Sequence, residues 1–140
     1  MGGEMALWLI VGVAIALASP FTNTAVVELD GAKYAVYTAD NLARWTIGYM
    51  NVTAYDPRGV GAVGMLFVFP KNSTYCFWMK NTYLPLRMVW IAGETVTQSA
   101  LAAPLDTTPI CGYGDKVLEL RPDLPPPAVV AVERPRRPGP

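Results

Sequence analysis

The segment MLFVFPKNSTYCFWMK, residues 65–80, decides the fold class of this 140-residue chain. Its two apolar runs, MLFVF and YCFWM, carry large side chains at both odd and even positions. Because side chains alternate between the two faces of a strand, such runs predict strands that are covered on both faces. The residues between the runs, 70–73, predict a turn. The segment therefore predicts two neighbouring core strands.

The rest of the chain adds further strand signals and one helix signal. Residues 25–29 and 32–38 predict two strands joined by Asp30-Gly31, a favoured two-residue hairpin turn. Leu42, Trp45 and Tyr49 recur at helical spacing, so we expect one short helix, followed by a long glycine-rich connection over residues 51–64. Later strands are expected at residues 86–92, 95–102, 116–120 and 128–133.

Together these signals predict a mainly β protein. We expect a compact antiparallel sandwich or small barrel with one short helix, preceded by an apolar N-terminal leader. Residues 25–120 would form a single β domain, and residues 121–140 a proline-rich C-terminal extension. The last seven residues of that extension are expected to be disordered.

The N-terminal segment has features of an export signal. Residues 5–18 are uncharged and mostly apolar, and they end in Ala-Leu-Ala, which is typical of a cleavage site. As a helix they would reach roughly 21 Å, short of the roughly 30 Å hydrocarbon core of a membrane. Glu4 stands where signals carry positive charge, which leaves an uncleaved membrane anchor as an alternative to a signal peptide for residues 1–19. A buried helix of the domain is a third alternative. We predict an extracytoplasmic protein, secreted or tethered to the membrane through this segment alone.

The composition narrows the class of function. Hydrophobic residues make up 52% of the chain and charged residues 16%, so the chain should fold around a core. Eleven basic and eleven acidic residues leave no net field that would attract nucleic acid, and we expect no nucleic-acid partner. The chain has no histidine, which excludes Ser-His-Asp and Cys-His catalysis and removes the usual ligand of zinc. We expect no metal and no cofactor, and no residue pattern identifies a catalytic group.

Two cysteines and two short asparagine motifs bear on the compartment. Cys76 and Cys111 could form a disulfide in an oxidising compartment, or remain as two buried thiols. A disulfide over that separation would stabilise the fold by roughly 3 to 4 kcal/mol. Asn51 and Asn72 each begin an Asn-x-Ser/Thr pattern and are candidate glycosylation sites, although so short a pattern often arises by chance.

Several short motifs match one known family. They are YTAD at residues 37–40, GYM at 48–50, GMLFVFP at 64–70, FWMKNT at 77–82, LPL at 84–86 and VLEL at 117–120. In these motifs the chain resembles the domain-of-unknown-function 192 family over about residues 26–120. The resemblance implies a compact β domain, often exported or lipid-anchored, whose biochemical role is not established. The family commonly has an acid where this chain has Arg87, which counts against a mechanism that pairs such an acid with Lys80.

Lys80 marks the candidate binding region. If the strand continues that far, Lys80 lies on the same face as Trp78. A lysine beside a core must be paired, reach water or serve a ligand, because burying a lone ammonium costs several kcal/mol. Its structural partners would be an aromatic face, Asp106 or Asp115, or the carbonyls of residues 81–85. Alternatively the region is a ligand groove, for which the candidate residues are Trp78, Lys80, Asn81, Tyr83 and Trp90.

Three functions remain open. The first is a monomeric binding or accessory module of the cell envelope, with an unknown envelope ligand or protein partner and a groove near Lys80 and Asn81. The second is a structural or protein-interaction domain with no small-ligand site. The third is a hydrolase or transferase that uses carboxylates such as Asp106 and Asp115. We favour the first, and a protein that is not an enzyme.

Overall fold

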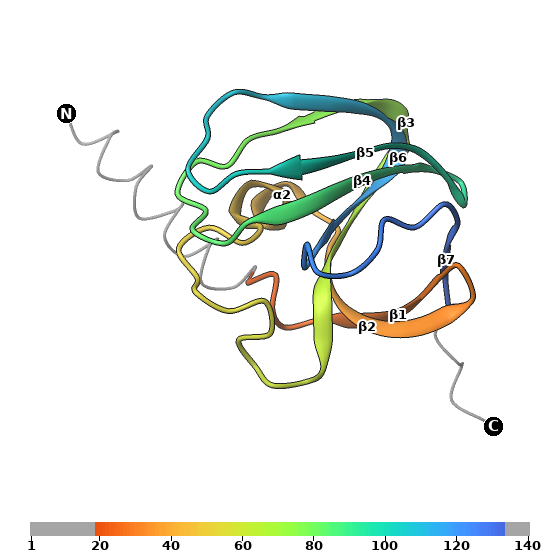
Figure 1. Cartoon of the computed structure of the whole chain (residues 1–140), viewed down its shortest axis with the longest axis horizontal. Helices are drawn as coiled ribbons and strands as arrows, with labels where there is room; N and C mark the ends of the chain where they lie inside the picture. Colours follow the sequence, from red (N-terminus) through yellow and green to blue (C-terminus); the bar gives the residue numbers. More distant parts are fainter. Residues whose placement is uncertain (1–18, 134–140) are drawn as a thin grey trace.

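A single curled β-sheet and one short helix make up the computed structural model, which describes residues 19–133 (Figure 1). The elements are β1 (Thr24–Leu29), β2 (Ala32–Ala39), α2 (Leu42–Ile47), β3 (Ala62–Phe77), β4 (Leu86–Ala92), β5 (Thr95–Ala102), β6 (Ile110–Leu120) and β7 (Val130–Val132). The seven strands are ordered β5-β4-β6-β3-β2-β1-β7, and their sheet curls into a half-barrel. The predicted mainly β fold is confirmed. The predicted leader and the predicted disorder of the last seven residues lie outside the described residues.

The hairpin and the helix form where local signals predicted them. Asp30 and Gly31 join β1 to β2 with positive φ angles of 49° and 88°, as a tight hairpin turn requires. At the start of α2 the Asn41 side chain accepts a hydrogen bond from the N–H of Arg44 (3.0 Å). The helix ends at Gly48, where φ is 45°. Among residues 19–133, no helix is long and apolar enough to cross a membrane.

The pairing of β2 with β3 is parallel, which corrects the expectation of an antiparallel sheet. Parallel neighbours need a long crossover connection, and here α2 and the loop that follows it provide one. Asp56 anchors this loop to β2, because its carboxylate accepts a hydrogen bond from the Tyr37 hydroxyl (2.5 Å). The same carboxylate accepts hydrogen bonds from the N–H groups of Val60 and Gly61 (3.0 and 2.7 Å).

The prediction of a turn at residues 70–73 is wrong, because β3 continues through these residues. Residues 64–68 of β3 pair with residues 116–120 of β6, and residues 73–77 pair with 110–114. Residues 69–72 therefore face a single β6 residue. Pro70 has no N–H to give to the ladder, and at such an irregularity the strand bends instead of ending. β6 also begins earlier than predicted, at Ile110, because it follows the second half of β3.

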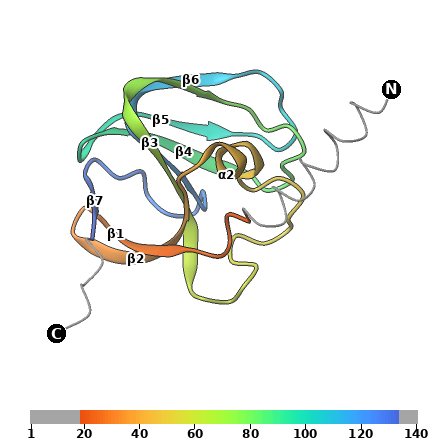
Figure 2. The same ribbon diagram turned by 180° about the vertical axis from the view of Figure 1, so that it is seen from behind.

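The two ends of the sheet approach each other near β7 (Figure 2). β7 pairs with β1, while the N–H of Val130 donates to the carbonyl of Glu94 (2.9 Å) beside β5. The N–H of Val96 in turn donates to the carbonyl of Ala128 (3.1 Å). These bonds protect the outer strands from pairing with other chains. The described part of the proline-rich extension thus takes part in the sheet.

Both faces of the central strands are buried, as the MLFVF run predicted. The same prediction for the YCFWM run is wrong, because Cys76 and Trp78 on one of its faces are exposed. One face carries Met65 and Phe67, and Leu66 between them points to the other. The first face continues in Tyr37, Met88, Trp90 and Val117, and the second in Val36, Val89, Ile91, Leu118 and Leu120. Trp45 of α2 packs on the first face against Phe69, with ring centroids 4.8 Å apart. The helix therefore covers the same face that forms the site described below.

Cys76 of β3 and Cys111 of β6 lie directly opposite each other and form a disulfide. Both cysteines are exposed, so the alternative of two buried thiols is wrong. Beside them, Gly112 packs under the indole of Trp90, and a Cβ on Gly112 would lie 2.7 Å from the indole Cδ1. The Trp90 Nε1 donates to the carbonyl of Tyr75 (2.9 Å). The indole of Trp90 on β4 therefore contacts both disulfide-bonded strands, β3 through Tyr75 and β6 through Gly112.

Candidate ligand-binding cleft

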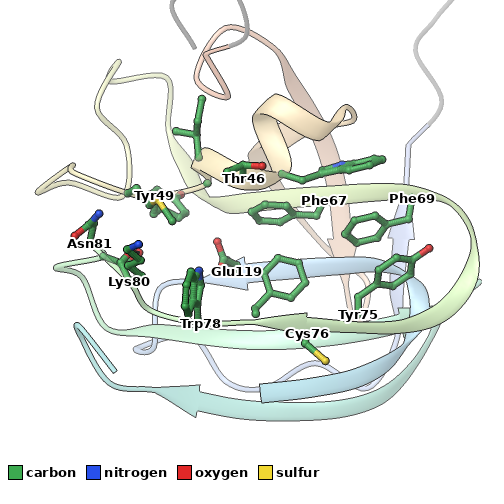
Figure 3. A pocket seen from close by; sticks show the side chains of 16 residues that line it. Thr46, Tyr49, Phe67, Phe69, Tyr75, Cys76, Trp78, Lys80, Asn81 and Glu119 are labelled. Carbon is green, nitrogen blue, oxygen red and sulfur yellow. The ribbon is translucent and has the colours of Figure 1, made fainter. Parts of the chain in front are cut away.

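A cleft of about 510 Å³ opens between α2 and the bent strand β3 (Figure 3). This volume is within the range of small-molecule sites in proteins. Its walls come from α2 and the turn after it, from both halves of β3, from the loop after β3 and from one residue of β6. In that order they are residues 45–50, then Phe67, Phe69, Tyr75, Cys76 and Phe77, then Trp78, Lys80, Asn81 and Thr82, and finally Glu119.

The bend of β3 builds the aromatic wall of the cleft. Because the strand turns over residues 69–72, side chains of its first half face those of its second half (Figure 3). Phe69 stacks on Tyr75 with centroids 3.8 Å apart and an interplanar angle of 11°. Phe67 meets Phe77 edge to face at 5.1 Å. Such pairs stabilise the bend beyond the area they bury, so the wall is largely pre-formed.

Glu119 lies at the base of the cleft (Figure 3). It is 4% exposed and stands on β6 between Met65 of β3 and Met88 of β4. None of the hydrogen bonds and ion pairs found among residues 19–133 involves its carboxyl group. Burial raises the pKa of Glu119 from 4.5 to about 8, because water no longer stabilises the charged form. At neutral pH this carboxyl group is therefore mostly protonated.

Gly48 leaves the carboxyl group of Glu119 open to the cleft. A Cβ on Gly48 would lie 3.5 Å from Glu119 Oε1 and 3.2 Å from Cζ of Phe67. A larger side chain would thus cover the acid. The neighbouring Tyr49 is 1% exposed and donates its hydroxyl to the carbonyl of Tyr55 (2.9 Å), so this hydroxyl is committed away from Glu119. Burial, with a contribution from Glu119, raises the pKa of Tyr49.

The predicted site residues Trp78, Lys80 and Asn81 line the cleft together. The Lys80 Nζ lies 5.3 Å from the centroid of the Trp78 ring, which is the aromatic partner considered among the structural alternatives. Asn81 has a positive φ of 54°, and its carbonyl accepts a hydrogen bond from the N–H of Asn51 (2.8 Å). This bond ties the loop after β3 to the turn after α2, and so joins the two rims of the cleft.

The two other predicted site residues lie elsewhere. Trp90 is fully buried, so its ring is part of the core and offers no surface to a ligand. Tyr83 is 50% exposed but does not line the cleft. Strand alternation alone could not separate these residues from Trp78, because burial depends on which strands cover them.

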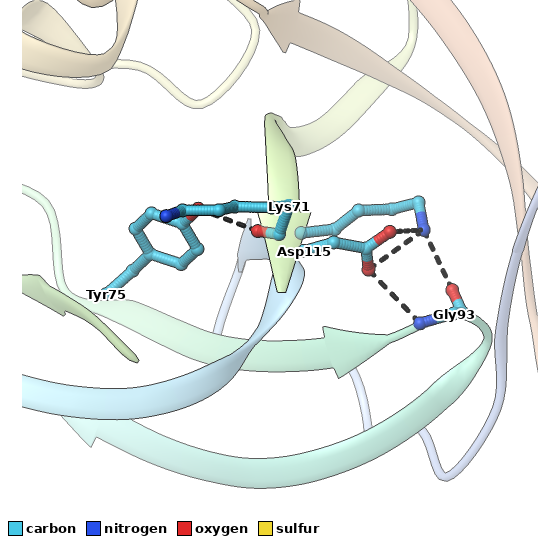
Figure 4. A network of polar contacts seen from close by, with 5 residues as sticks. Lys71, Tyr75, Gly93 and Asp115 are labelled. Carbon is cyan, nitrogen blue, oxygen red and sulfur yellow. Dashed lines mark hydrogen bonds and ion pairs between the residues drawn. The ribbon is translucent and has the colours of Figure 1, made fainter. Parts of the chain in front are cut away.

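Neither acid of the predicted carboxylate pair lines the cleft. Asp115 accepts a hydrogen bond from the N–H of Gly93 (3.1 Å) and forms an ion pair with Lys116 (3.1 Å), which holds the β4–β5 turn against β6 (Figure 4). Asp106 accepts a hydrogen bond from the N–H of Thr108 (2.9 Å) in an exposed loop. Both carboxylates therefore have local structural partners.

Three further positions singled out in the sequence are placed by the fold. Arg87 stands on β4, does not line the cleft, and donates from Nη2 to the carbonyl of Pro122 (3.4 Å). Its separation from the cleft shows that the position 87 side chain and Lys80 do not share this site. Asn51 and Asn72 are both exposed, in the turn after α2 and at the bend of β3. The described residues contain no group of three or more acids and cysteines that could hold a metal ion.

Sequence reasoning missed Glu119, Gly48 and the aromatic pairs of the β3 bend. A signal for Glu119 was present, because it is the one charged residue in VLEL, at a position where the first face of the strand should be apolar. A charge inside a run that is buried on both faces must have a partner, a shifted pKa or a ligand. Its neighbours in the cleft are distant in the sequence, so their identity could not be inferred.

Fold and site together define a small half-barrel β domain with an aromatic cleft over a buried acid. The chain matches the family model DUF192, described as "Uncharacterized ACR", over residues 25–125, and it belongs to that family. The resemblance seen in the sequence motifs is thereby confirmed. No curated protein is similar enough to match the chain.

Two solved structures are similar to this chain. One is a Sinorhizobium meliloti 1021 protein described as "a putative transcription regulator", with 28% identity and a TM-score of 0.65 over 79% of this chain and 94% of that one. The other is a protein of unknown function from Novosphingobium aromaticivorans DSM 12444, with 23% identity and a TM-score of 0.60 over 77% of this chain and 83% of that one. The second likeness shows a shared fold.

Proposed function

We propose that this protein is a small-ligand-binding module of the cell envelope, and that the cleft over Glu119 is its binding site. The observation that carries the proposal is a buried carboxyl group that opens into an aromatic cleft and has no protein partner. Leaving a buried polar group unpaired costs roughly 1 to 3 kcal/mol, and more for a charged one. A bound ligand that pairs with the group offsets this cost.

The contents of the cleft support binding over carboxylate catalysis. Glycoside hydrolysis needs two carboxyl groups that flank the scissile bond, whereas Glu119 is the one acid among the lining residues. The aromatic rings offer apolar contact area, and Lys80 and Asn81 offer donors at the rim. This combination of a large apolar wall and few polar groups is typical of ligand sites.

The disulfide supports an extracytoplasmic location, and the charge balance bears on the class of ligand. The Cys76–Cys111 disulfide is exposed, and exposed disulfides persist in oxidising compartments. The balance of eleven basic and eleven acidic residues favours a ligand other than nucleic acid. Export would proceed through the N-terminal segment. Alkylation of thiols immediately after lysis of native cells tests the location, and a fully reduced cysteine pair would contradict it.

Titration calorimetry of the full chain tests the binding site. The probes are benzyltrimethylammonium, benzyl alcohol and phenylacetate, which share a phenyl ring and differ in charge. Thr46→Trp places a large side chain on the α2 wall of the cleft and should abolish binding of any probe that binds there. Thr107→Trp is the matched control, because Thr107 is exposed and outside the cleft. Heat signals that are equal in the two variants, or absent for every probe, would refute the proposed site.

A further inference from the structure

We propose that the cleft selects small organic monocations, with the positive charge paired to Glu119 and the apolar body held by the aromatic wall. This inference rests on the proposed binding function and deepens it by naming the class of ligand. It is carried by three arrangements in the structure: the isolation of the acid, the positions of the nearby basic groups, and the rings around the cleft.

The acid at the base is isolated from the protein's own cations. Arg44 of α2 forms its ion pair with Asp40 (2.8 Å) and does not line the cleft. Lys80 is exposed at the rim, with its ammonium over the Trp78 ring, and forms no ion pair with Glu119. The charge of Glu119 is therefore available to a cation that enters the cleft.

The other elements around Glu119 bring no competing charge. Its strand neighbours on β3 and β4 are Met65 and Met88, which are apolar. Besides Lys80 at the rim and Glu119 itself, the titratable groups that line the cleft are the phenols of Tyr49, after α2, and Tyr75, on the second half of β3. Both phenols donate to backbone carbonyls, at 2.9 and 2.7 Å, so neither is committed as a donor to Glu119.

The rings complete the chemistry of a cation site. An alkylammonium over an aromatic face is attracted by the negative face of the ring, and the attraction is stronger when water is excluded. The chain itself shows this interaction at the rim, where the Lys80 ammonium sits on Trp78. Phe67 and Phe77, whose ring centroids are 5.1 Å apart, line the same cleft as Glu119. A cation with an apolar body would contact these rings and the carboxylate at once.

Binding of a cation should be coupled to release of a proton. The empty cleft favours the neutral acid, whereas an ion pair requires the carboxylate, so only the ionised fraction is competent to bind. With a pKa of about 8, that fraction rises nearly a hundredfold between pH 6 and pH 9. The affinity for a permanent cation should rise by the same factor. A neutral ligand that accepts a hydrogen bond from the protonated acid would show the opposite trend.

The test compares benzyltrimethylammonium with benzyl alcohol, by calorimetry of the full chain at pH 6, 7, 8 and 9. We expect the cation to bind wild type about tenfold more tightly than the alcohol at pH 9, and its affinity to fall nearly a hundredfold at pH 6. In Glu119→Gln, the preference for the cation and its pH dependence should both disappear, while benzyl alcohol still binds. Glu94→Gln, at an exposed turn, is the matched control and should behave as wild type.

The two proposals fail in different ways. The cation inference would be overturned if benzyl alcohol or phenylacetate bound at least as tightly as the cation. If Thr46→Trp also abolished that binding, the proposed binding function would stand. A cation affinity that falls as pH rises, or that Glu119→Gln leaves unchanged, would also overturn the cation inference. If none of the probes binds, both proposals fail. Retained alcohol binding by Glu119→Gln shows that this variant is folded.

Discussion

Replacing Glu119 with glutamine removes the buried ionisable group while keeping the shape of the side chain. In the folded protein burial holds the pKa of Glu119 at about 8, against 4.5 for an unburied carboxyl group. The folded state therefore binds this proton more tightly than the unfolded state does. The resulting contribution to stability is fully present below about pH 4.5 and is lost as the pH rises to about 8.

The size of the effect follows from the pKa difference. Each pH unit between the two values removes about 1.4 kcal/mol, so wild type should lose up to about 5 kcal/mol of unfolding free energy between pH 4.5 and pH 8. Glu119→Gln should lack this loss. Its amide still buries a polar group, so the variant should be no more stable than wild type near pH 5 and clearly more stable at pH 9.

Urea unfolding followed by tryptophan fluorescence at pH 5, 6, 7, 8 and 9 measures both curves. Glu94→Gln removes an exposed carboxyl group and controls for the loss of one acid, so its curve should run parallel to wild type above pH 5. The reasoning is refuted if wild type and Glu119→Gln lose stability equally between pH 5 and pH 9. Such a result would mean that Glu119 ionises in the folded protein as easily as in the unfolded chain.

Three further predictions concern the frame around the cleft. Replacing Cys76 and Cys111 together with serine should lower the unfolding free energy by about 3 to 4 kcal/mol, because a crosslink over 35 residues is lost, and a reductant should then no longer affect stability. Gly112→Ala should lower it by about 1 to 3 kcal/mol, because the new Cβ overlaps the Trp90 indole; a urea midpoint equal to wild type would contradict this. Asp56→Asn should lower Tm at neutral pH. Hydrogen bonds, above all from a tyrosine hydroxyl, lower the pKa of Asp56, so its contribution is present above about pH 3.8 and lost in stronger acid, where the two melting curves should converge.

Features set by neighbouring residues were predictable from the sequence. The Asp30-Gly31 turn requires positive φ angles that these residues adopt readily, so the first hairpin formed as expected. The bounds predicted for β4 and β5 match the structure, because alternation and a tight turn at Gly93 define both strands locally. Trp78, Lys80 and Asn81 lie together on the cleft for the same reason, since they are adjacent in the chain.

Features that depend on distant partners were not predictable. The Pro70 region looks like a turn in sequence, yet β6 pairs with the strand on both sides of it and converts the turn into a bend. The parallel pairing of β2 with β3 follows from the crossover through α2, which strand propensity does not reveal. Trp90 was predicted to offer a surface to a ligand, but its packing on Gly112 and its place in the core cluster bury it completely.

By itself the sequence determined a mainly β domain with one helix, the MLFVF run as a strand buried on both faces, and the family to which the chain belongs. The physical reason is that turn chemistry and alternation are local, and short motifs identify a family without its fold being known. Only the tertiary structure decided the site. Glu119 on β6 is surrounded by the β3 bend, some fifty residues earlier in the chain, and by the turn after α2 at Gly48. The burial that sets its pKa exists only when all three elements are in place.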